Sequence, residues 1–461
     1  RLCDEMGFML MIEAFDEWDE AKCENGYHRY FKDWAERDMV NMVRQFRNSP
    51  SVVMWSVGNE VPSQYSANGW RTARFLRDIC HREDPTRPVT CGMDQASCVM
   101  DNGFASEFDI PGFNYRTHRY TEAYRRLPQA LMLGTETAST VSSRGVYHFP
   151  VKKQANALTD DHQCSSYDLE YCSWSNIPDE DFALADDYPW TLGQFVWTGF
   201  DYLGEPSPYD TNAWPNHSSM FGIIDLASIP KDRYFLYQSQ WLRDGSDVLH
   251  TLPHWTWPGR EGKVTPVFVY TTFPSAELFV NGKSQGRRSF KSKTEATDNT
   301  QRYRLMWDSV RYEPGQIQVI AYDSLGQQAM QQTIATAGKP HHIEIWGRDG
   351  EGLTADGRDL YYLTVTVTDK DGNLCPHYNG LLHFRVKGCG KFKAVANGDP
   401  TCLESFQAPQ MHAFGGKLTV IVQASTQPGT VTLEVTGKGL RKGSATVAVS
   451  EKTENDNELA Q

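Results

Sequence analysis

A short apolar stretch that ends in a carboxylate most constrains how this chain can fold. Residues 51–60 read Ser-Val-Val-Met-Trp-Ser-Val-Gly-Asn-Glu, so a run of β-favouring residues stops at Asn59 and Glu60. A buried parallel strand has this pattern, because both of its faces are covered and its carboxyl end opens on polar residues. Residues 130–136, Ala-Leu-Met-Leu-Gly-Thr-Glu, repeat the pattern and end in Glu136. Two such strands predict a pair of carboxylates at one edge of a sheet.

Apolar segments alternate with amphipathic ones through the first half of the chain. The predicted strands cover residues 7–14, 51–60, 87–93, 108–115, 130–136 and 193–200, and the predicted helices cover residues 29–46, 67–81 and 121–127. This alternation predicts an α/β fold with a parallel sheet. Because six strands are two fewer than eight, we expect a (β/α)8 TIM barrel whose first two strand–helix units precede residue 1. An open doubly wound sheet is the alternative, but no Gly-rich nucleotide-binding turn supports it.

Helical periodicity disappears after about residue 243, and short alternating strands replace it. We expect a catalytic barrel over residues 1–242, a β-sandwich over 243–336, an immunoglobulin-like β-sandwich over 337–450 and a polar tail over 451–461. Asn281-Gly282 is a hairpin signal within the first sandwich. Residues 137–192 are predicted to form a long loop, and loops of that length are usually functional or lid-like.

Composition narrows the class of partner. The chain has 461 residues, 39% of them hydrophobic, and a net charge of −13. An acidic protein of this kind disfavours nucleic acid and anionic membrane surfaces as partners. No apolar run reaches the ~20 residues that a membrane-spanning helix needs. Ten cysteines without a CxxC pair predict mostly buried free thiols rather than a disulfide or metal framework.

Three motifs, in this order, resemble those of glycoside hydrolase family 2. They are Trp-Ser-Val-Gly-Asn-Glu at 55–60, Gly-Thr-Glu-Thr-Ala-Ser at 134–139, and Gly-Gln-Phe-Val-Trp-Thr-Gly-Phe-Asp-Tyr-Leu-Gly-Glu-Pro at 193–206. The chain is most similar to the C-terminal part of the family's β-galactosidases of gut-bacterial type. The resemblance is close up to about residue 240 and looser beyond. It implies an oligosaccharide or glycan substrate, no cofactor and a periplasmic or secreted bacterial protein, and it leaves a homo-oligomer open.

The resemblance also divides the roles of the two glutamates. Glu60 matches the family's acid/base and Glu136 its nucleophile. A retaining mechanism needs the two carboxyl groups about 5–5.5 Å apart. The acid must start protonated, and we expect the negative charge of Glu136 to raise the pKa of Glu60. Solvated loop carboxylates are the alternative reading.

Four further residues are candidate substrate contacts. The resemblance implies that Asn59 binds the sugar 2-hydroxyl, that Tyr115 contacts the nucleophile, and that Trp197, within the last predicted strand, is a platform for the sugar ring. Asp94, at the end of the third predicted strand, is placed to accept hydrogen bonds from sugar hydroxyls. The alternatives are a strand cap for Asn59, core packing for the two aromatic residues and a surface position for Asp94.

Weaker candidates surround this set. Asp16, Trp18, Asp201 and Glu205 are placed either to touch substrate or to hold loops. The histidines at 118, 148 and 162 have no metal-ligand spacing, so we predict no metal site. The family's magnesium ligands cannot be mapped onto this sequence.

The class of sugar is predicted from a lysine that the sequence lacks. Family glucuronidases carry an Asn-any-Lys pair near the last strand that binds the sugar carboxylate, whereas residues 216–222 contain no lysine. This favours a neutral sugar, with β-galactoside as the nearest match and β-mannoside or β-glucuronide as alternatives. A non-catalytic carbohydrate-binding homologue is the alternative of another class, and exposed coplanar aromatic residues on one sandwich face would favour it.

Overall fold

The structure is a computed structural model that describes residues 1–209, 213–243, 245–347 and 352–451. The chain divides into two compact units. The first comprises Arg1–Ser139 and Ser173–Trp197, and the second comprises Thr140–Cys172 and Thr198–Gln461.

A six-stranded parallel sheet forms the centre of the first unit. Its strands follow chain order: β1 (Leu10–Glu13), β2 (Val52–Asn59), β3 (Val89–Met93), β4 (Gly112–Asn114), β5 (Met132–Thr137) and β9 (Thr191–Val196). All neighbouring pairs are parallel. The predicted parallel sheet of the barrel domain is therefore confirmed, with its carboxyl ends at one edge.

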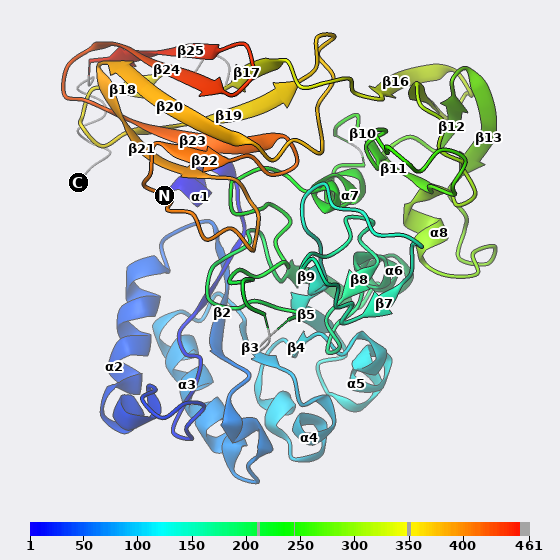
Figure 1. The fold of residues 1–461 in the computed structure, drawn as a ribbon. Helices are drawn as coiled ribbons and strands as arrows, with labels where there is room; N and C mark the ends of the chain where they lie inside the picture. The colour runs from blue at the N-terminus through cyan, green and yellow to red at the C-terminus, as the bar shows by residue number, and fades with distance from the viewer. Residues whose placement is uncertain (210–212, 244, 348–351, 452–461) are drawn as a thin grey trace. The chain divides into compact units, whose positions relative to one another are not determined.

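Helices lie around this sheet in Figure 1. They are α2 (His28–Phe46), α3 (Gly69–Glu83), α4 (Ala96–Asp101) and α5 (Tyr120–Arg126), after a short α1 (Leu2–Met6). Helix α2 buries one apolar stripe, formed by Phe31, Ala35, Met39 and Val43. Trp34 and Phe46 are also apolar residues at helical spacing, but they are exposed, and the Arg37 guanidinium lies 4.5 Å from the Trp34 ring. The buried stripe is therefore narrower than the apolar pattern of the sequence, because it follows a single i, i+4 row of the helix.

The segment predicted as a long loop, residues 137–192, is not one. It contains strands β6 (Thr140–Val141), β7 (Gln154–Ala155) and β8 (Glu170–Tyr171), which form a small sheet, and helix α6 (Pro178–Asp187). Proline near the start of α6 and three acidic residues in its first turn are ordinary helix-start signals. The prediction of a segment without secondary structure was wrong, because these short elements lack the length that makes periodicity visible in a sequence. The functional or lid-like role stays a prediction.

Two β-sandwich domains lie in the second unit. The first has sheets β10 (Leu249–Leu252), β11 (Val267–Thr271), β14 (Leu305–Trp307) and β13 (Lys283–Ser289), β12 (Ser275–Val280), β15 (Gln316–Tyr322), β16 (Gln328–Ala335). Helix α7 (Asp232–Trp241) precedes it and α8 (Thr300–Tyr303) lies within it. The predicted Asn281-Gly282 turn joins β12 to β13, with φ values of 47° and 77°.

The second sandwich has its own core. One sheet is β17 (His342–Trp346), β19 (Leu360–Thr368), β23 (Lys417–Ala424) and β21 (Gly390–Ala396); the other is β18 (Leu353–Thr354), β25 (Gly443–Ser450), β24 (Gly429–Gly437), β20 (Leu381–Gly388) and β22 (Gln410–His412). Of the predicted polar tail, residues 452–461 lie outside the described residues. All ten cysteines are free thiols, and five of them are buried, which is fewer than the sequence predicted.

A buried carboxylate organises the chain between β1 and α2. Glu17 is 3% exposed and accepts hydrogen bonds from the backbone N–H groups of Lys22, Cys23 and His28 and from the His28 ring. Burial alone would raise the pKa of Glu17, but these hydrogen bonds lower it to about 2. Gly26 is required beside it, because a Cβ there would lie 1.9 Å from Glu17 Oε1.

Replacing this carboxylate should therefore cost stability in a pH-dependent way. Glu17→Gln removes the charge that strengthens these bonds, so we expect the free energy of unfolding at pH 7 to fall by about 1–3 kcal/mol. Since the folded pKa lies below the unfolded one, the contribution is complete above about pH 5 and is lost as pH falls towards 2. Denaturant unfolding at several pH values measures it, and a difference between the two proteins that stays constant from pH 7 to 3 would contradict this role.

Candidate active site

The end of β4 connects two carboxylates that come from different strands. Asn114 Nδ2 donates to Glu60 Oε1 at 3.0 Å, and the phenol of the next residue, Tyr115, donates to Glu136 Oε2 at 2.9 Å. Asn114 Nδ2 also donates to Asn59 Oδ1 at 2.7 Å. Consecutive residues therefore hold the two glutamates that the sequence singled out.

Glycine at the end of β3 makes this contact between strands possible. Asn59 pairs with Gly92 in the sheet, and Gly92 O accepts the Glu60 N–H at 2.8 Å. A Cβ on Gly92 would lie 2.7 Å from Asn59 Oδ1 and 2.9 Å from Asn114 Oδ1. A side chain at this position would therefore push apart the amides that support Glu60.

Hydroxyl groups orient the support on the other side. Ser139 Oγ donates to the Tyr115 phenol oxygen at 3.0 Å, and Thr135 Oγ1 donates to Asn114 Oδ1 at 2.7 Å. The Asn114 amide is completely buried, so its oxygen and nitrogen have fixed directions. Buried polar groups with all partners in place hold a single arrangement.

Several site residues have left-handed backbone conformations. The φ values are 47° at Glu60, 59° at Tyr115 and 45° at Ala138, although none of them is glycine. Such conformations cost about 1–3 kcal/mol each and persist where the surroundings impose them, often at functional sites. Their location at the ends of three strands supports a functional role for this edge of the sheet.

Burial raises the pKa of both carboxyl groups. For Glu60 the hydrogen bond from Asn114 opposes the effect of burial, and the negative charge of Asp94 adds to it. For Glu136 burial raises the pKa to about 8; the charge of Glu60 adds to the rise and the Tyr115 hydrogen bond opposes it. The predicted rise for Glu60 is confirmed, with burial as its largest cause and Asp94 as an addition, and the repulsion between Glu60 and Glu136 acts on both groups.

Asp94 and Trp197 differ from the simplest expectation. Asp94 accepts a hydrogen bond from Gln64 Nε2 at 2.7 Å and another from Gln95, and it lies 3.8 Å from the Arg116 guanidinium. Trp197 is the first residue after β9 (Thr191–Val196) instead of lying within the strand. Its backbone N–H donates to Thr137 O at 2.9 Å.

The weaker candidates near β1 separate clearly. Trp18 is completely buried, donates to Val57 O at 2.9 Å and stacks on Phe104, so it belongs to the core. Asp16 is exposed and pairs with Lys22 Nζ at 2.8 Å. Of these two weak candidates, Trp18 is therefore a core residue, and Asp16 is an exposed partner of Lys22.

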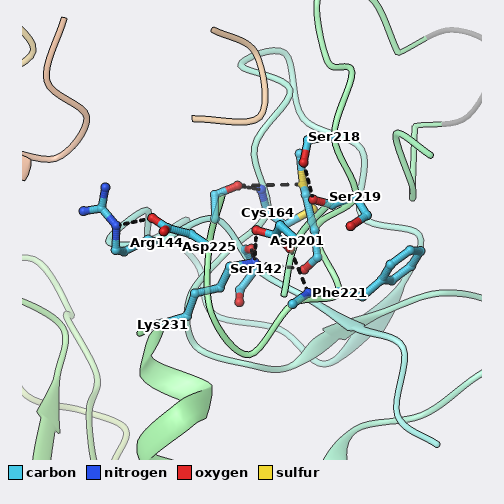
Figure 2. A network of polar contacts seen from close by, with 12 residues as sticks. Ser142, Arg144, Cys164, Asp201, Ser218, Ser219, Phe221, Asp225 and Lys231 are labelled. Atoms are coloured by element: carbon cyan, nitrogen blue, oxygen red, sulfur yellow. Dashed lines mark hydrogen bonds and ion pairs between the residues drawn. The ribbon is translucent and has the colours of Figure 1, made fainter. Parts of the chain in front are cut away.

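Asp201 holds the polypeptide in place in the second unit. Figure 2 shows Lys231 extending to Asp201 and to the backbone of Ser142, at distances of 2.7 and 2.6 Å. Asp201 also accepts the Gly222 N–H at 2.7 Å. Because Lys231 is completely buried at its ammonium end and Asp201 is nearly so, this carboxylate serves as a structural counter-ion. Glu205 is exposed and accepts the Tyr202 phenol hydrogen.

Sequence reasoning missed three residues of the carboxylate site. Asn114 carried only the signal of a polar residue at a strand end. Lys22 Nζ donates to Asn59 O at 3.2 Å, and its charge lowers the pKa of Glu136. Glu13, at the end of β1, accepts from Ser56 Oγ at 2.7 Å and raises the pKa of Glu136. Only the folded chain brings Lys22 to this edge.

Within the residues that the structure describes, no group of three or more His, Cys, Asp or Glu side chains is arranged to hold a metal ion. His148 pairs instead with Asp161 at 2.9 Å.

No described helix is long and apolar enough to cross a membrane.

Comparison with known proteins identifies the fold. Residues 1–167 match the family model "Glycosyl hydrolases family 2, TIM barrel domain", and residues 347–446 match "Glycoside hydrolase family 2 C-terminal domain 5". The chain belongs to glycoside hydrolase family 2. Residues 262–330 match a domain of unknown function.

The family 2 relatives include both galactosidases and glucuronidases. Beta-galactosidase BoGH2A of Bacteroides ovatus is 38% identical and aligns with 98% of this chain and 56% of its own length. A beta-glucuronidase of Formosa agariphila is 22% identical over 96% of this chain and 41% of its own length. The crystal structure of a beta-glycosidase from Bacteroides vulgatus has a TM-score of 0.81 and 31% identity, covering 97% of this chain and 57% of that one. The chain thus spans about half the length of the relatives it matches.

The buried ion pair gives a test that separates a structural carboxylate from a substrate ligand. Asp201→Asn leaves the Lys231 charge unpaired in the interior, so we expect a loss of about 3–5 kcal/mol of unfolding free energy. Asp101→Asn is the matched control, because Asp101 pairs with Arg126 on the surface and should cost less than about 1 kcal/mol. Thermal unfolding measures both, and equal losses would show that Asp201 has no special structural role.

Proposed function

We propose that the protein to which this chain belongs is a retaining glycoside hydrolase that releases terminal β-linked galactose. The observation that carries the proposal is the pair of hydrogen bonds from Asn114 to Glu60 and from Tyr115 to Glu136. Two half-buried carboxyl groups held from one strand end suit double displacement at an anomeric carbon.

Glu60 is the acid/base and Glu136 the nucleophile in this proposal. Burial raises the pKa of both groups and the two charges repel each other, so the pair holds a proton. When that proton is on Glu60, burial and Glu13 still raise the pKa of Glu136, whereas the Glu60 charge no longer does, and Tyr115 and Lys22 lower it. Asp94 favours protonated Glu60. Burial and Glu136 also raise the pKa of Tyr115, so its phenol remains a donor.

The first step breaks the glycosidic bond. The carboxylate of Glu136 attacks the anomeric carbon while Glu60 transfers its proton to the departing glycosidic oxygen. In the second step Glu60, now ionised, removes a proton from water, and the resulting nucleophile displaces Glu136. Both steps invert the anomeric carbon, so the configuration is retained. Asn59, Trp197 and Asp94 are proposed to contact the sugar, with Asn59 at the 2-hydroxyl.

The remaining parts of the proposal follow the sequence reading. We propose a barrel domain over residues 1–242, sandwich domains over 243–336 and 337–450, and a periplasmic or secreted location.

Trp346 and Tyr362, which are exposed, lie on one face of the β17–β19 sheet, since Trp346 pairs with Thr364. This pair suits glycan binding, but the supported carboxylates favour a catalytic protein over a binding module alone.

A β-glucuronidase is the second candidate, and Lys22 is the observation that favours it. The sequence argument against a charged sugar considered only the region after β9, whereas Lys22 lies at the carboxylate site. Its ammonium is already paired with Asp16 at 2.8 Å, which leaves a neutral sugar as the first choice. Competition with Asp16 would weaken a bond to a sugar carboxylate.

Sugar specificity tests these two candidates. The full-length protein should hydrolyse aryl β-galactosides with a kcat/KM at least tenfold above that for aryl β-glucuronides. Lys22→Met should not increase that preference, because the ammonium is paired with Asp16 and is not expected to bind a glucuronide carboxylate. A glucuronide preference that Lys22→Met abolishes would establish the second candidate and overturn the first.

The two glutamates should differ in how their loss depends on the leaving group. Glu136→Ala should abolish turnover of every substrate, since no other group forms the glycosyl-enzyme. Glu60→Ala should retain glycosylation by a dinitrophenyl galactoside far better than by lactose, because a good leaving group needs little protonation. Pre-steady-state release of dinitrophenol measures this step. Equal losses with both substrates would remove Glu60 from the acid role.

A further inference from the structure

The second unit contains a cavity of about 490 Å3 that shares no residue with the carboxylate site. Its lining comes from the loop after β6, the start of α7, strands β10 and β16, and the turns at 372–376 and 415–417. Sites for small molecules in proteins usually enclose about 300–1,000 Å3. The cavity therefore has the volume to hold one or two sugar rings.

Two cationic side chains line this cavity with donors that have no partner. Lys417 is half-buried, and its ammonium makes no hydrogen bond or ion pair with any residue that the structure describes. Arg144 is 7% exposed; its Nε donates to Asp225 at 2.5 Å and its Nη2 donates to Asn397 O and Phe414 O. Across the described ranges, Arg144 Nη1 has no such partner. Figure 2 shows the Nε side of the guanidinium directed at Asp225.

The two charges repel each other. Burial and the Arg144 charge lower the pKa of Lys417, and the charges of Asp232 and Asp225 only partly oppose them. A cation that is half-buried, unpaired and beside a second cation is unfavourable in an empty protein. An anion bound between Lys417 and Arg144 would attract both cations and would accept hydrogen bonds from the Lys417 ammonium and from Arg144 Nη1.

Neutral polar atoms at the cavity also lack partners. Thr251 is 4% exposed, and its buried hydroxyl makes no hydrogen bond. The buried side-chain oxygen of Gln332 also makes none. Both residues line the cavity. Buried polar atoms are rarely left unsatisfied in native proteins, so each points to a missing hydrogen-bonding group.

The remaining lining suits a ring with hydroxyl groups. Asp232 is the anionic side chain of the lining, and each of its oxygens already has a partner at 2.6 Å, Tyr147 on one side and His250 on the other. Phe235 stacks on His250 at 3.9 Å between ring centroids. Trp255 adds a further aromatic wall. Aromatic surface with a few fixed polar groups is the usual composition of a small-molecule site.

We propose that this cavity is a second ligand site that binds an anionic saccharide, one or two sugar rings that carry a carboxylate or a sulfate. Lys417 and Arg144 bind the anionic group, Thr251 and Gln332 bind hydroxyl groups, and the aromatic residues cover the ring. The site requires no activity at Glu60 and Glu136, so it stands apart from the proposed hydrolysis.

Calorimetric titration of the full-length protein tests this site. The probes are galacturonate, glucuronate and galactose 6-sulfate, with galactose and sodium sulfate at matched ionic strength as references. We expect at least one acidic sugar to bind tenfold more tightly than either reference, and the preferred probe distinguishes a carboxylate from a sulfate. Binding of inorganic sulfate as tight as that of the acidic sugars would overturn the saccharide assignment.

Variants then locate the binding. Lys417→Met should weaken the acidic sugar at least tenfold and raise the unfolding midpoint of the empty protein, because it removes an unpaired half-buried charge. Lys391→Met is the matched control, since Lys391 is exposed on β21 of the same sheet and should change neither quantity. Thr251→Val preserves both charges and should weaken binding severalfold. Binding that survives Lys417→Met but is lost in Lys22→Met would place the anion at the carboxylate site and overturn the proposal.

Discussion

The hydrogen bonds made by Asn114 and Tyr115 are the interactions on which the proposed catalytic site depends. Each side chain binds a different carboxyl group, and because the two residues are consecutive, the spacing of the carboxylates is coupled to the backbone at one strand end. Neither Glu60 nor Glu136 needs the other to be held in place. The parallel sheet supplies this arrangement, since its strands all end at one edge.

The same arrangement explains the electrostatics. Burial at the sheet edge disfavours two charges, so the pair keeps a proton near neutral pH, and the surroundings decide where it resides. Asp94 raises the pKa of Glu60, Tyr115 lowers the pKa of Glu136, and Lys22 lowers both. Gly92 keeps the two amides in contact, and the left-handed backbone at Glu60 and Tyr115 directs both side chains. The strained backbone at Glu60 and Tyr115 and the glycine at position 92 thus all lie where the chemistry is proposed.

The strands and both glutamates could be predicted from the sequence because buried parallel strands leave a long apolar signal that ends abruptly. Residues 137–192 could not, since two-residue strands and a ten-residue helix are too short for periodicity to be distinctive. Trp34 and Phe46 fitted an apolar face yet are exposed, because a sequence pattern does not state how wide a stripe the neighbours cover. Lys22 and Asn114 came together only in three dimensions. The cavity at Lys417 was equally invisible, since it is assembled from segments more than 250 residues apart.

Azide rescue of the two glutamate variants tests the assignment of acid/base and nucleophile most directly. In the full-length Glu60→Ala variant, azide should attack the glycosyl-enzyme and give the β-galactosyl azide. In Glu136→Ala no such intermediate forms, so azide should attack the substrate itself and give the α-galactosyl azide. Proton NMR of the product distinguishes the two anomers. The β-azide from Glu60→Ala and the α-azide from Glu136→Ala are the predicted results, and the opposite pairing, or two variants that retain full activity without azide, would contradict the proposed roles.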